Sequence, residues 1–189
     1  MPCSILTYTK VRFNPLRAKV EDIRIEDIAH SLSLMTRANG HCRHFYSVAQ
    51  HSIACCREAV ARGYTARVQL GCLLHDASES YISDITRPVK INLPEYVVIE
   101  KRLQNVIYER FGLDGLTAEE LELIRNVDDT LLYYELEALM DLQILDEAPY
   151  KAMEHEFKEE DWRKVEQAFL SLYDRIDSMM SDLGNVESL

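Results

Sequence analysis

The sequence predicts one mainly α-helical domain with a short β-strand or hairpin near its N-terminus. Apolar residues recur at helical spacing from Ile25 onward, whereas strand-like alternation is confined to residues 4–13. The chain contains no internal repeat, low-complexity tract or Gly/Ser linker. Because 189 residues suffice for one substantial core, we expect a single domain over residues 1–189. Its motifs lie between about residues 25 and 140, and a C-terminal helix is expected at about 161–180.

Three helices are predicted to follow the N-terminal strand in the first half of the chain. The alternating segment ends at Asn14-Pro15. Apolar spacing places a first helix over about residues 25–40 and a second over about 45–63. A third is expected from about residue 65 to the adjacent His75 and Asp76.

The second half is predicted to contain a loop and then three helices. Residues 82–94 hold two prolines and are expected to form the loop, with a helix over about 94–111. Thr117, with Glu120 three residues later, forms a capping box that opens the next long helix. The last helix has 4-3-4-3 apolar spacing, which suits either a core-facing stripe or a seam with a partner. This stripe consists of Val165, Phe169, Leu172, Ile176 and Met179.

The composition excludes several classes of partner. The chain has 32 acidic and 21 basic side chains and a net charge of −11, so we expect neither nucleic acid nor a membrane, which attract basic surfaces. It shows no targeting pattern and no apolar run of membrane-spanning length, which predicts a cytoplasmic protein. The cysteines form no CxxC pair, which predicts reduced thiols, and Cys55-Cys56 suits packing better than nucleophilic chemistry. The five cysteines are Cys3, Cys42, Cys55, Cys56 and Cys72.

Two histidines and two aspartates offer ligands for one divalent transition metal. They are His51, the adjacent His75 and Asp76, and Asp128. Two imidazoles with two carboxylates suit Mn, Co, Fe, Ni or Zn. Adjacent residues converge on one ion most easily at a helix end, where the apolar run 70–74 places His75 and Asp76. A lone histidine beside an apolar helix face, such as His51, is more often a packed core residue.

Asp128 gives the strongest independent indication, because it interrupts an apolar stripe. It stands where a leucine is expected, while Asp129 is rotated off the stripe. A buried, unpaired carboxylate costs several kcal/mol, so Asp128 requires a cation, an arginine or a cluster of donors. A metal meets this requirement, and a structural salt bridge is the alternative. The stripe consists of Leu121, Ile124, Leu131, Leu132, Leu136 and Leu139.

Two further carboxylates are placed to transfer protons. Glu79 lies four residues after His75 and three after Asp76, on a shared helical face. Asp84 follows Asp76 by eight residues, at the proline-containing loop. We expect Glu79 and Asp84 to be the acid–base pair. The alternative for each is an ordinary solvated or turn-forming carboxylate.

Three other side chains are expected to contact a substrate phosphate. His44 precedes His51 by seven residues, which is two turns away on the same helical face. Arg37, at the end of the first predicted helix, carries a guanidinium fork that matches phosphate oxygens. Lys90 brings an ammonium group to the loop that follows Asp84.

These residues, in this order, resemble the HD-domain phosphohydrolase superfamily, whose pattern is a histidine, a later His-Asp pair and a distant aspartate. The 5'-deoxynucleotidase branch is matched by residues 44–52 (HFYSVAQHS) and 75–90 (HDASESYISDITRPVK). Its phage and prophage relatives are matched by residues 27–41 (DIAHSLSLMTRANGH). The resemblance covers about residues 4–135 and is weak in the C-terminal third.

The resemblance implies an all-helical bundle, often a homodimer, that acts on a small nucleotide substrate. The roles that it implies are metal ligation for His51, His75, Asp76 and Asp128, assistance to the attacking water for Glu79, support of proton transfer for Asp84, and phosphate contact for Arg37 and Lys90. The expected reaction is metal-dependent removal of the 5'-phosphate from (deoxy)nucleoside monophosphates.

Three alternatives stay open at this point. A deoxynucleoside triphosphate triphosphohydrolase would use the same metal centre with extra basic residues, and the modest supply of these near the motifs favours monophosphates. A non-enzymatic helical dimer module would keep the metal as a structural clip. A helical dimer without metal would need Asp128 paired to an arginine. The sequence has no GxxxxGK[ST] loop, so ATP-driven chemistry is not indicated.

Overall fold

A small antiparallel hairpin precedes the helices. The computed structural model describes residues 4–186, and within them β1 (Ile5–Leu6) pairs with β2 (Arg12–Phe13). The hairpin predicted for residues 4–13 is therefore confirmed. Asn14 ends it, because its side chain accepts a hydrogen bond from Leu16 N and caps a 3-10 turn.

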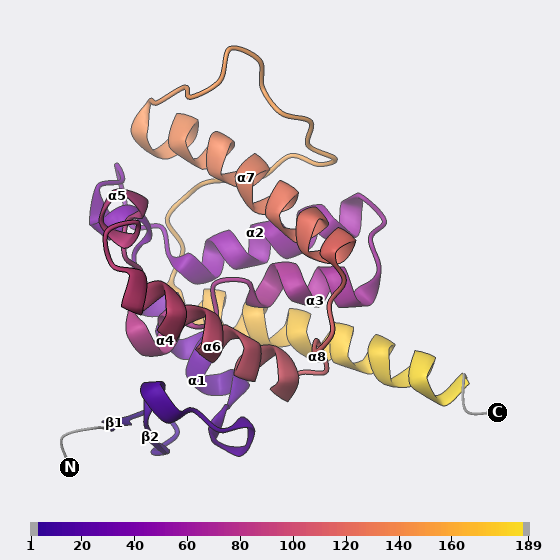
Figure 1. The fold of residues 1–189 in the computed structure, drawn as a ribbon. Coiled ribbons are helices and arrows are strands. Elements are labelled where there is room, and N and C mark those ends of the chain that lie inside the picture. Colours follow the sequence, from indigo (N-terminus) through magenta and orange to yellow (C-terminus); the bar gives the residue numbers. More distant parts are fainter. Residues whose placement is uncertain (1–3, 187–189) are drawn as a thin grey trace.

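The rest of the described chain is mainly α-helical, as predicted. Helices α2 and α3 lie side by side at the centre, α7 covers them on one side, and α1 and α8 pack on the other (Figure 1). Within residues 4–186, none of the helices has the length and apolar content needed to cross a membrane. The helices are α1 (Ile25–Leu34), α2 (Val48–Ala61), α3 (Ala66–Leu74), α4 (Glu79–Ile82), α5 (Arg87–Lys90), α6 (Pro94–Arg110), α7 (Ala118–Met140) and α8 (Trp162–Val186).

Capping side chains fix where the central helices begin. The predicted capping box of α7 is confirmed, because Thr117 Oγ1 accepts from Glu120 N and Glu120 Oε2 accepts from Thr117 N. Ser47 and Gln50 form a second capping box, which starts α2 at Val48. The prediction that this helix begins near residue 45 was therefore wrong.

Two other predicted boundaries were also wrong. The first helix ends at Leu34 instead of near residue 40, because the chain turns extended at Met35 and Thr36 forms an isolated bridge with Ser47. A separate 3-10 turn, Arg37–Gly40, follows. Residues 82–94, predicted as a loop, contain the one-turn helix α5. Proline is tolerated there because a first helical turn leaves its N–H groups without intrahelical partners.

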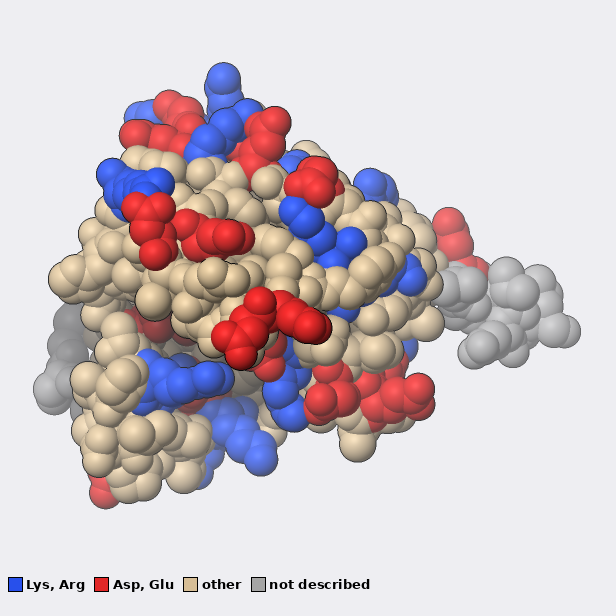
Figure 2. Space-filling view, turned by 90° about the horizontal axis from the view of Figure 1, so that it is seen from above, with Lys and Arg blue, Asp and Glu red and all other residues tan. Residues whose placement is uncertain are grey.

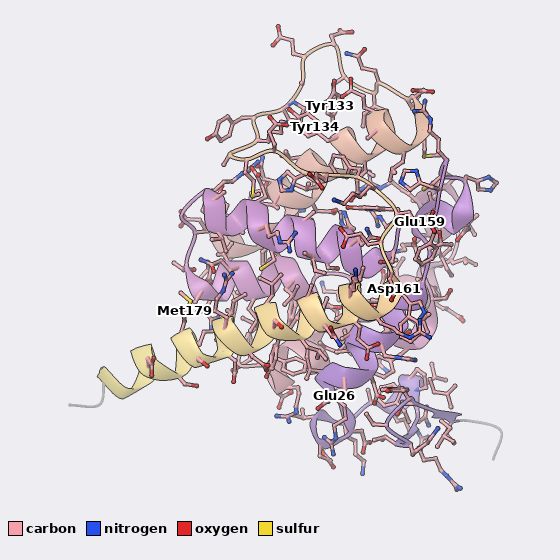
Figure 3. The ribbon with its side chains drawn as sticks, turned by 180° about the vertical axis from the view of Figure 1, so that it is seen from behind. Glu26, Tyr133, Tyr134, Glu159, Asp161 and Met179 are labelled. Carbon is pink, nitrogen blue, oxygen red and sulfur yellow. The ribbon has the colours of Figure 1, made fainter. Side chains whose placement is uncertain are left out.

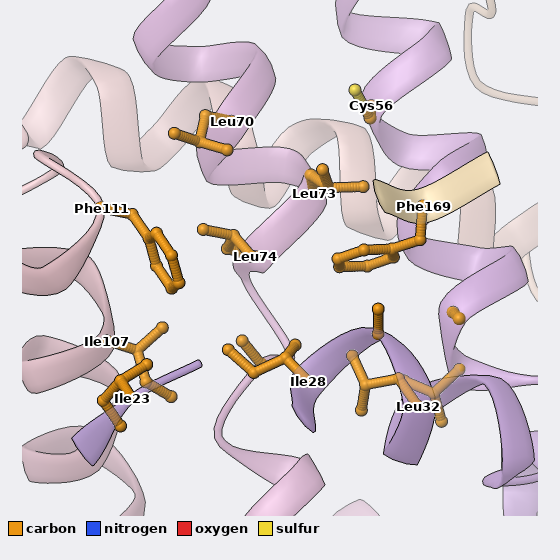
Figure 4. Packing of buried hydrophobic residues seen from close by; sticks show 14 of the residues in the cluster. Ile23, Ile28, Leu32, Cys56, Leu70, Leu73, Leu74, Ile107, Phe111 and Phe169 are labelled. Carbon is orange, nitrogen blue, oxygen red and sulfur yellow. The ribbon is translucent and has the colours of Figure 1, made fainter. Parts of the chain in front are cut away.

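The main core lies where α1, α3 and α8 meet. Phe169 of α8 packs near Leu73 and Leu74 of α3 and near Ile28 and Leu32 of α1 (Figure 4). The predicted stripe on α8 faces this core at Val165, Phe169 and Ile176, and Leu172 packs against it. Met179 departs from the stripe and is 43% exposed. Of the cysteines, Cys3 lies outside the described residues, and Cys42, Cys55, Cys56 and Cys72 are free, as predicted.

The segment between α7 and α8 crosses the back of the molecule and is tied to α2 (Figure 3). The fully buried carboxylate of Glu58 holds it, accepting from Ala152 N at 2.6 Å and lying 2.9 Å from His155 Nε2. Arg62 Nε donates to the same carboxylate at 2.8 Å. Glu58 therefore forms a buried Glu–Arg–His arrangement that serves packing.

Helices α3 and α7 approach each other closely at a glycine. A Cβ atom built on Gly71 would lie 2.3 Å from Ile124 Cδ1 and 3.1 Å from Ile124 Cγ1, so a larger residue would require the Ile124 side chain to move. One turn further along each helix stand His75 and Asp128, whose Nε2 and Oδ1 atoms are 3.6 Å apart. The contact between Gly71 and Ile124 thus lies directly beside this pair on both helices.

We expect Gly71→Ala to destabilise the protein by about 1–3 kcal/mol, because the added methyl overpacks the contact with Ile124. Urea unfolding measures the change. The double variant Gly71→Ala/Ile124→Val should recover part of the loss, whereas Ile124→Val alone should cost about 0.5–1.5 kcal/mol. A Gly71→Ala protein as stable as the wild type would contradict this account.

Candidate metal centre

Three helices bring the four predicted metal ligands to one place. His51 lies on α2 and is fully buried. His75 caps the C-terminus of α3, and Asp76 follows it in the turn, so this pair sits at a helix end as predicted. Asp128 lies near the middle of α7.

The ligand atoms of these residues are spaced as a shared ion requires. His51 Nε2 lies 3.2 Å from His75 Nε2 and 3.1 Å from Asp128 Oδ1. Asp76 Oδ2 lies 3.3 Å from His75 Nε2 and 3.8 Å from His51 Nε2. Atoms that each bind one ion at about 2.1 Å stand about 3.0–3.4 Å apart in octahedral or tetrahedral geometry. The cluster is thus close to the size of a coordination sphere.

The electrostatics of the cluster call for a cation. His75 Nδ1 lies 2.8 Å from Cys72 O, so Nδ1–H donates and Nε2 is the nitrogen that faces the cluster. Burial lowers the pKa of His75, but Asp76 and Asp128 outweigh this and raise that pKa well above its usual value. Burial likewise raises the pKa of Asp128, yet the two imidazoles lower it overall. Imidazole nitrogens and carboxylates therefore converge where positive charge, from a proton or a metal ion, is favoured.

Cys55 is a candidate ligand that the sequence reasoning missed. His51, Cys55, His75 and Asp128 each offer a ligand atom, and these atoms all lie within 4.8 Å of one another. Cys55 Sγ is 3.6 Å from His51 Nε2, because the two residues stand four apart on α2 and share a face. That spacing was visible in the sequence, but a cysteine in an apolar helix was interpreted as packing.

A cavity of about 360 Å³ opens over the cluster. Figure 2 shows a hollow on this face, with basic side chains beside it. It contains six of the predicted site residues, namely Arg37, Asp76, Glu79, Asp84, Lys90 and Asp128. The remaining lining residues are Ala38, Cys42, Ile85, Thr86, Arg87, Leu132, Glu135, Leu136, Leu139 and Met140.

Glu79 is a buried carboxyl group beside the cluster. It is 5% exposed, and its Oε2 atom has no hydrogen-bond partner among the described residues. Burial, and then the charges of Asp76 and Asp84, raise its pKa to about 9. Its expected place on the helix of His75 was wrong, because α3 ends and Glu79 begins the separate helix α4. It still lines the cavity, and in the ion-free protein this raised pKa favours its protonated form at neutral pH.

The two predicted phosphate-binding cations are both paired with carboxylates. Arg37 lies in the 3-10 turn after α1, not at the end of that helix, and its Nη2 is 3.2 Å from Glu135 Oε2. Lys90 Nζ lies 2.6 Å from Glu100 Oε1. Arg87 also lines the cavity and is exposed.

His44 is placed differently from the prediction. It was expected two turns before His51 on one helix, but Ser47 caps α2, so His44 lies in the preceding irregular segment. The residues described as lining the cavity include Cys42 but not His44.

The prediction that Asp128 interrupts a core-facing stripe was also wrong in part. Its side chain is 34% exposed and shares the cavity wall with Leu132 and Leu136, each one turn further along α7. The core face of α7 is instead formed by Ile124, Val127 and Leu131. Leu121 belongs to neither face and is 39% exposed. Because α7 lies between a core and a cavity, it has two apolar faces. The sequence pattern assigned the residues of both faces to one stripe.

Glu135 is the second residue that the sequence reasoning missed. It is 3% exposed on α7, and its Oε1 lies 2.7 Å from His51 Nδ1. Asp128 precedes it by seven residues, or two turns, so both face the same side of the helix. This spacing was the available signal. Among the described residues, Asp128 has imidazoles and no arginine within ion-pair distance.

Comparison with known proteins gives relatives without a stated function. No protein-family model matches the sequence. The chain is 40% identical over 109 residues to YfdR of Escherichia coli K12, which is described as uncharacterized. It is 38% identical over 116 residues to an uncharacterized protein of Rhodobacter capsulatus. The aligned parts cover 58% of this chain and 58% and 59% of the two relatives. The chain thus spans less than two thirds of the length of either relative.

The pKa of Glu79 predicts how stability depends on pH in metal-free protein. The folded state keeps the Glu79 proton up to about pH 9, whereas the unfolded chain releases it near its ordinary pKa of 4.5. The free energy of unfolding should therefore fall as pH rises between these values. For Glu79→Gln, the free energy of unfolding should fall less steeply with pH, as measured by urea unfolding in the presence of a chelator. The exposed control Glu119→Gln should keep the wild-type slope, and equal slopes in all three proteins would refute the assignment.

Proposed function

We propose that this chain is a divalent-metal-dependent phosphohydrolase of the HD-domain type, which removes the 5'-phosphate from (deoxy)nucleoside monophosphates. One observation carries the proposal. Ligand atoms of His51, His75, Asp76 and Asp128 converge at a cavity that is also lined by the buried carboxyl group of Glu79 and by basic side chains. The motif order that resembles the superfamily supports the same reaction.

The charge of the cavity supports both the metal and the phosphate. Its lining holds five carboxyl groups and three cations, and with Glu79 protonated the four remaining carboxylates leave an excess of one negative charge. Such a cavity repels a phosphate dianion until a divalent ion offsets the excess. A divalent ion held by the cluster would supply Lewis acidity and lower the pKa of bound water from about 15.7 to about 7.

The cavity residues have separable roles in the proposed reaction. A divalent ion beside Glu79 would favour its ionised form, which then accepts the proton of the attacking water. Asp84, which also lines the cavity, supports that transfer. Arg87 and Lys90 offset the charge that builds on the phosphate. The part of α7 that continues from Asp128 along the cavity is apolar, which suits the base and sugar of a nucleotide. Its lining residues are Leu132, Leu136, Leu139 and Met140.

The proposed reaction is tested by product analysis after metal removal and return of Mn²⁺ or Co²⁺. Deoxynucleoside monophosphates should yield nucleoside and orthophosphate. Tripolyphosphate from triphosphates would instead establish a triphosphohydrolase, and no metal-dependent product from any nucleotide would refute both. Size measurement in solution tests the homodimer that the resemblance implies.

Paired aspartate variants test the site itself. Asp128→Asn should abolish metal binding and hydrolysis, whereas Asp129→Asn, its exposed neighbour on α7, should keep both. Glu79→Gln should keep the metal and lower kcat about 10²–10⁴-fold, because an acid–base group is lost. Metal analysis and steady-state kinetics measure these effects, and a normal kcat for Glu79→Gln would remove that residue from the reaction.

Asp76 and Cys55 are alternative candidates for the fourth metal ligand, and we expect Asp76 to bind the metal. Its pKa is lowered by the neighbouring imidazoles against the effect of burial, whereas burial raises the pKa of the Cys55 thiol well above its usual value. A thiol must lose its proton to bind a metal. The Co²⁺ protein should therefore lack a sulfur-to-cobalt charge-transfer band. A band that disappears in Cys55→Ala would assign the cysteine instead.

A further inference from the structure

The buried carboxylate of Glu135 connects two parts of the candidate site. Its Oε1 atom lies 2.7 Å from His51 Nδ1. Its Oε2 atom accepts from Arg37 Nε at 3.3 Å and from Nη2 at 3.2 Å. Both oxygens are thus used, and neither contacts the atoms of His75 or Asp128 that form the cluster.

The contact with Glu135 decides which nitrogen of His51 is free. A carboxylate that is already paired with an arginine acts as an acceptor, so His51 Nδ1 must carry the hydrogen and donate it. The Nε2 atom then presents its lone pair, at 3.2 Å from His75 Nε2 and 3.1 Å from Asp128 Oδ1. Without this partner, neutral His51 could place its hydrogen on Nε2, where it would block a metal.

Arg37 is held by the same carboxylate. Its guanidinium has one edge on Glu135, and Nη1 points toward Asp76, 3.6 Å from Oδ2. The Arg37 side chain is 15% exposed, so this arrangement lies at the cavity wall and is largely shielded from water. In such surroundings a hydrogen bond between charged groups is stronger than one between neutral groups.

We propose that Glu135 is a positioning residue of the metal centre, which orients His51 for metal binding through Nδ1 and fixes Arg37 beside the cluster. The inference rests on the metal binding in the proposed function, but not on the identity of the substrate. Removing such a partner from a ligating histidine typically weakens metal affinity about 10- to 100-fold.

The chain supplies a matched control for a purely structural role. Glu58 is also fully buried and also contacts an arginine and a histidine, Arg62 at 2.8 Å and His155 at 2.9 Å, but these residues tie down the segment after α7. Glu58→Gln and Glu135→Gln therefore remove the same charge from similar surroundings. If burial alone matters, the two variants should behave alike.

Two measurements on Zn²⁺-loaded and metal-stripped protein test the proposal. By calorimetry, Glu135→Gln should bind Zn²⁺ about 10- to 100-fold more weakly than the wild type, while Glu58→Gln should lose stability and keep its affinity. By NMR, the His51 Nδ1–H proton, bonded to a carboxylate, should resonate downfield of the His75 Nδ1–H proton, bonded to a carbonyl. Glu135→Gln should bring these resonances together.

The outcomes separate this inference from the proposed function. Unchanged Zn²⁺ affinity in folded Glu135→Gln, equal affinity losses in both glutamine variants, or a wild type that binds no metal would overturn it. If Glu135→Gln does not fold, Glu135→Asp keeps the charge but retracts it, and an intermediate loss of affinity is expected. Neither readout requires turnover, so an inactive wild type that binds Zn²⁺ would remove only the proposed function.

Discussion

The close approach of α3 to α7 is the constraint on which the site depends. Gly71 lets the helices meet at Ile124, and the next turn of each helix carries His75 and Asp128. A larger residue at position 71 would force the Ile124 side chain to shift, one turn before both groups. Because α1 and α8 pack behind α2 and α3, the main core supports this geometry from the side opposite the cavity.

The same arrangement concentrates negative charge where a folded protein would avoid it. Carboxylates and imidazole lone pairs face one another, and Glu79 is buried without a hydrogen-bond partner for one oxygen. Each such group costs stability in the free protein. Groups of this kind cluster at sites of binding or catalysis. Arg37 and Glu135 limit this cost, since they pair with each other beside the cluster.

The sequence predicted best what local chemistry determines. The capping box at Thr117 and the helix end at His75 follow from neighbouring residues, and both are found. Predictions that assumed one uninterrupted helix were less successful. His44 fell outside α2 because Ser47 caps that helix, and Glu79 moved to a new helix because α3 ends at Leu74.

Sequence patterns did not predict contacts between segments that are distant along the chain. Glu135 is 84 residues from His51 along the chain, and only the packed fold shows that they touch. The two apolar faces of α7 could not be told apart for a similar reason. One faces the core and the other a cavity, and leucine serves both.

Because the cluster is formed by three separate helices, the stability of the folded protein would depend on the concentration of the ion. An unfolded chain cannot bring His51 and Asp128 together across 77 residues, so an ion would bind the folded state alone. At a free concentration one hundred times its Kd, such an ion adds about 2.7 kcal/mol to the free energy of unfolding. Metal starvation would then expose more unfolded chain to proteases, and the amount of protein would follow the available metal.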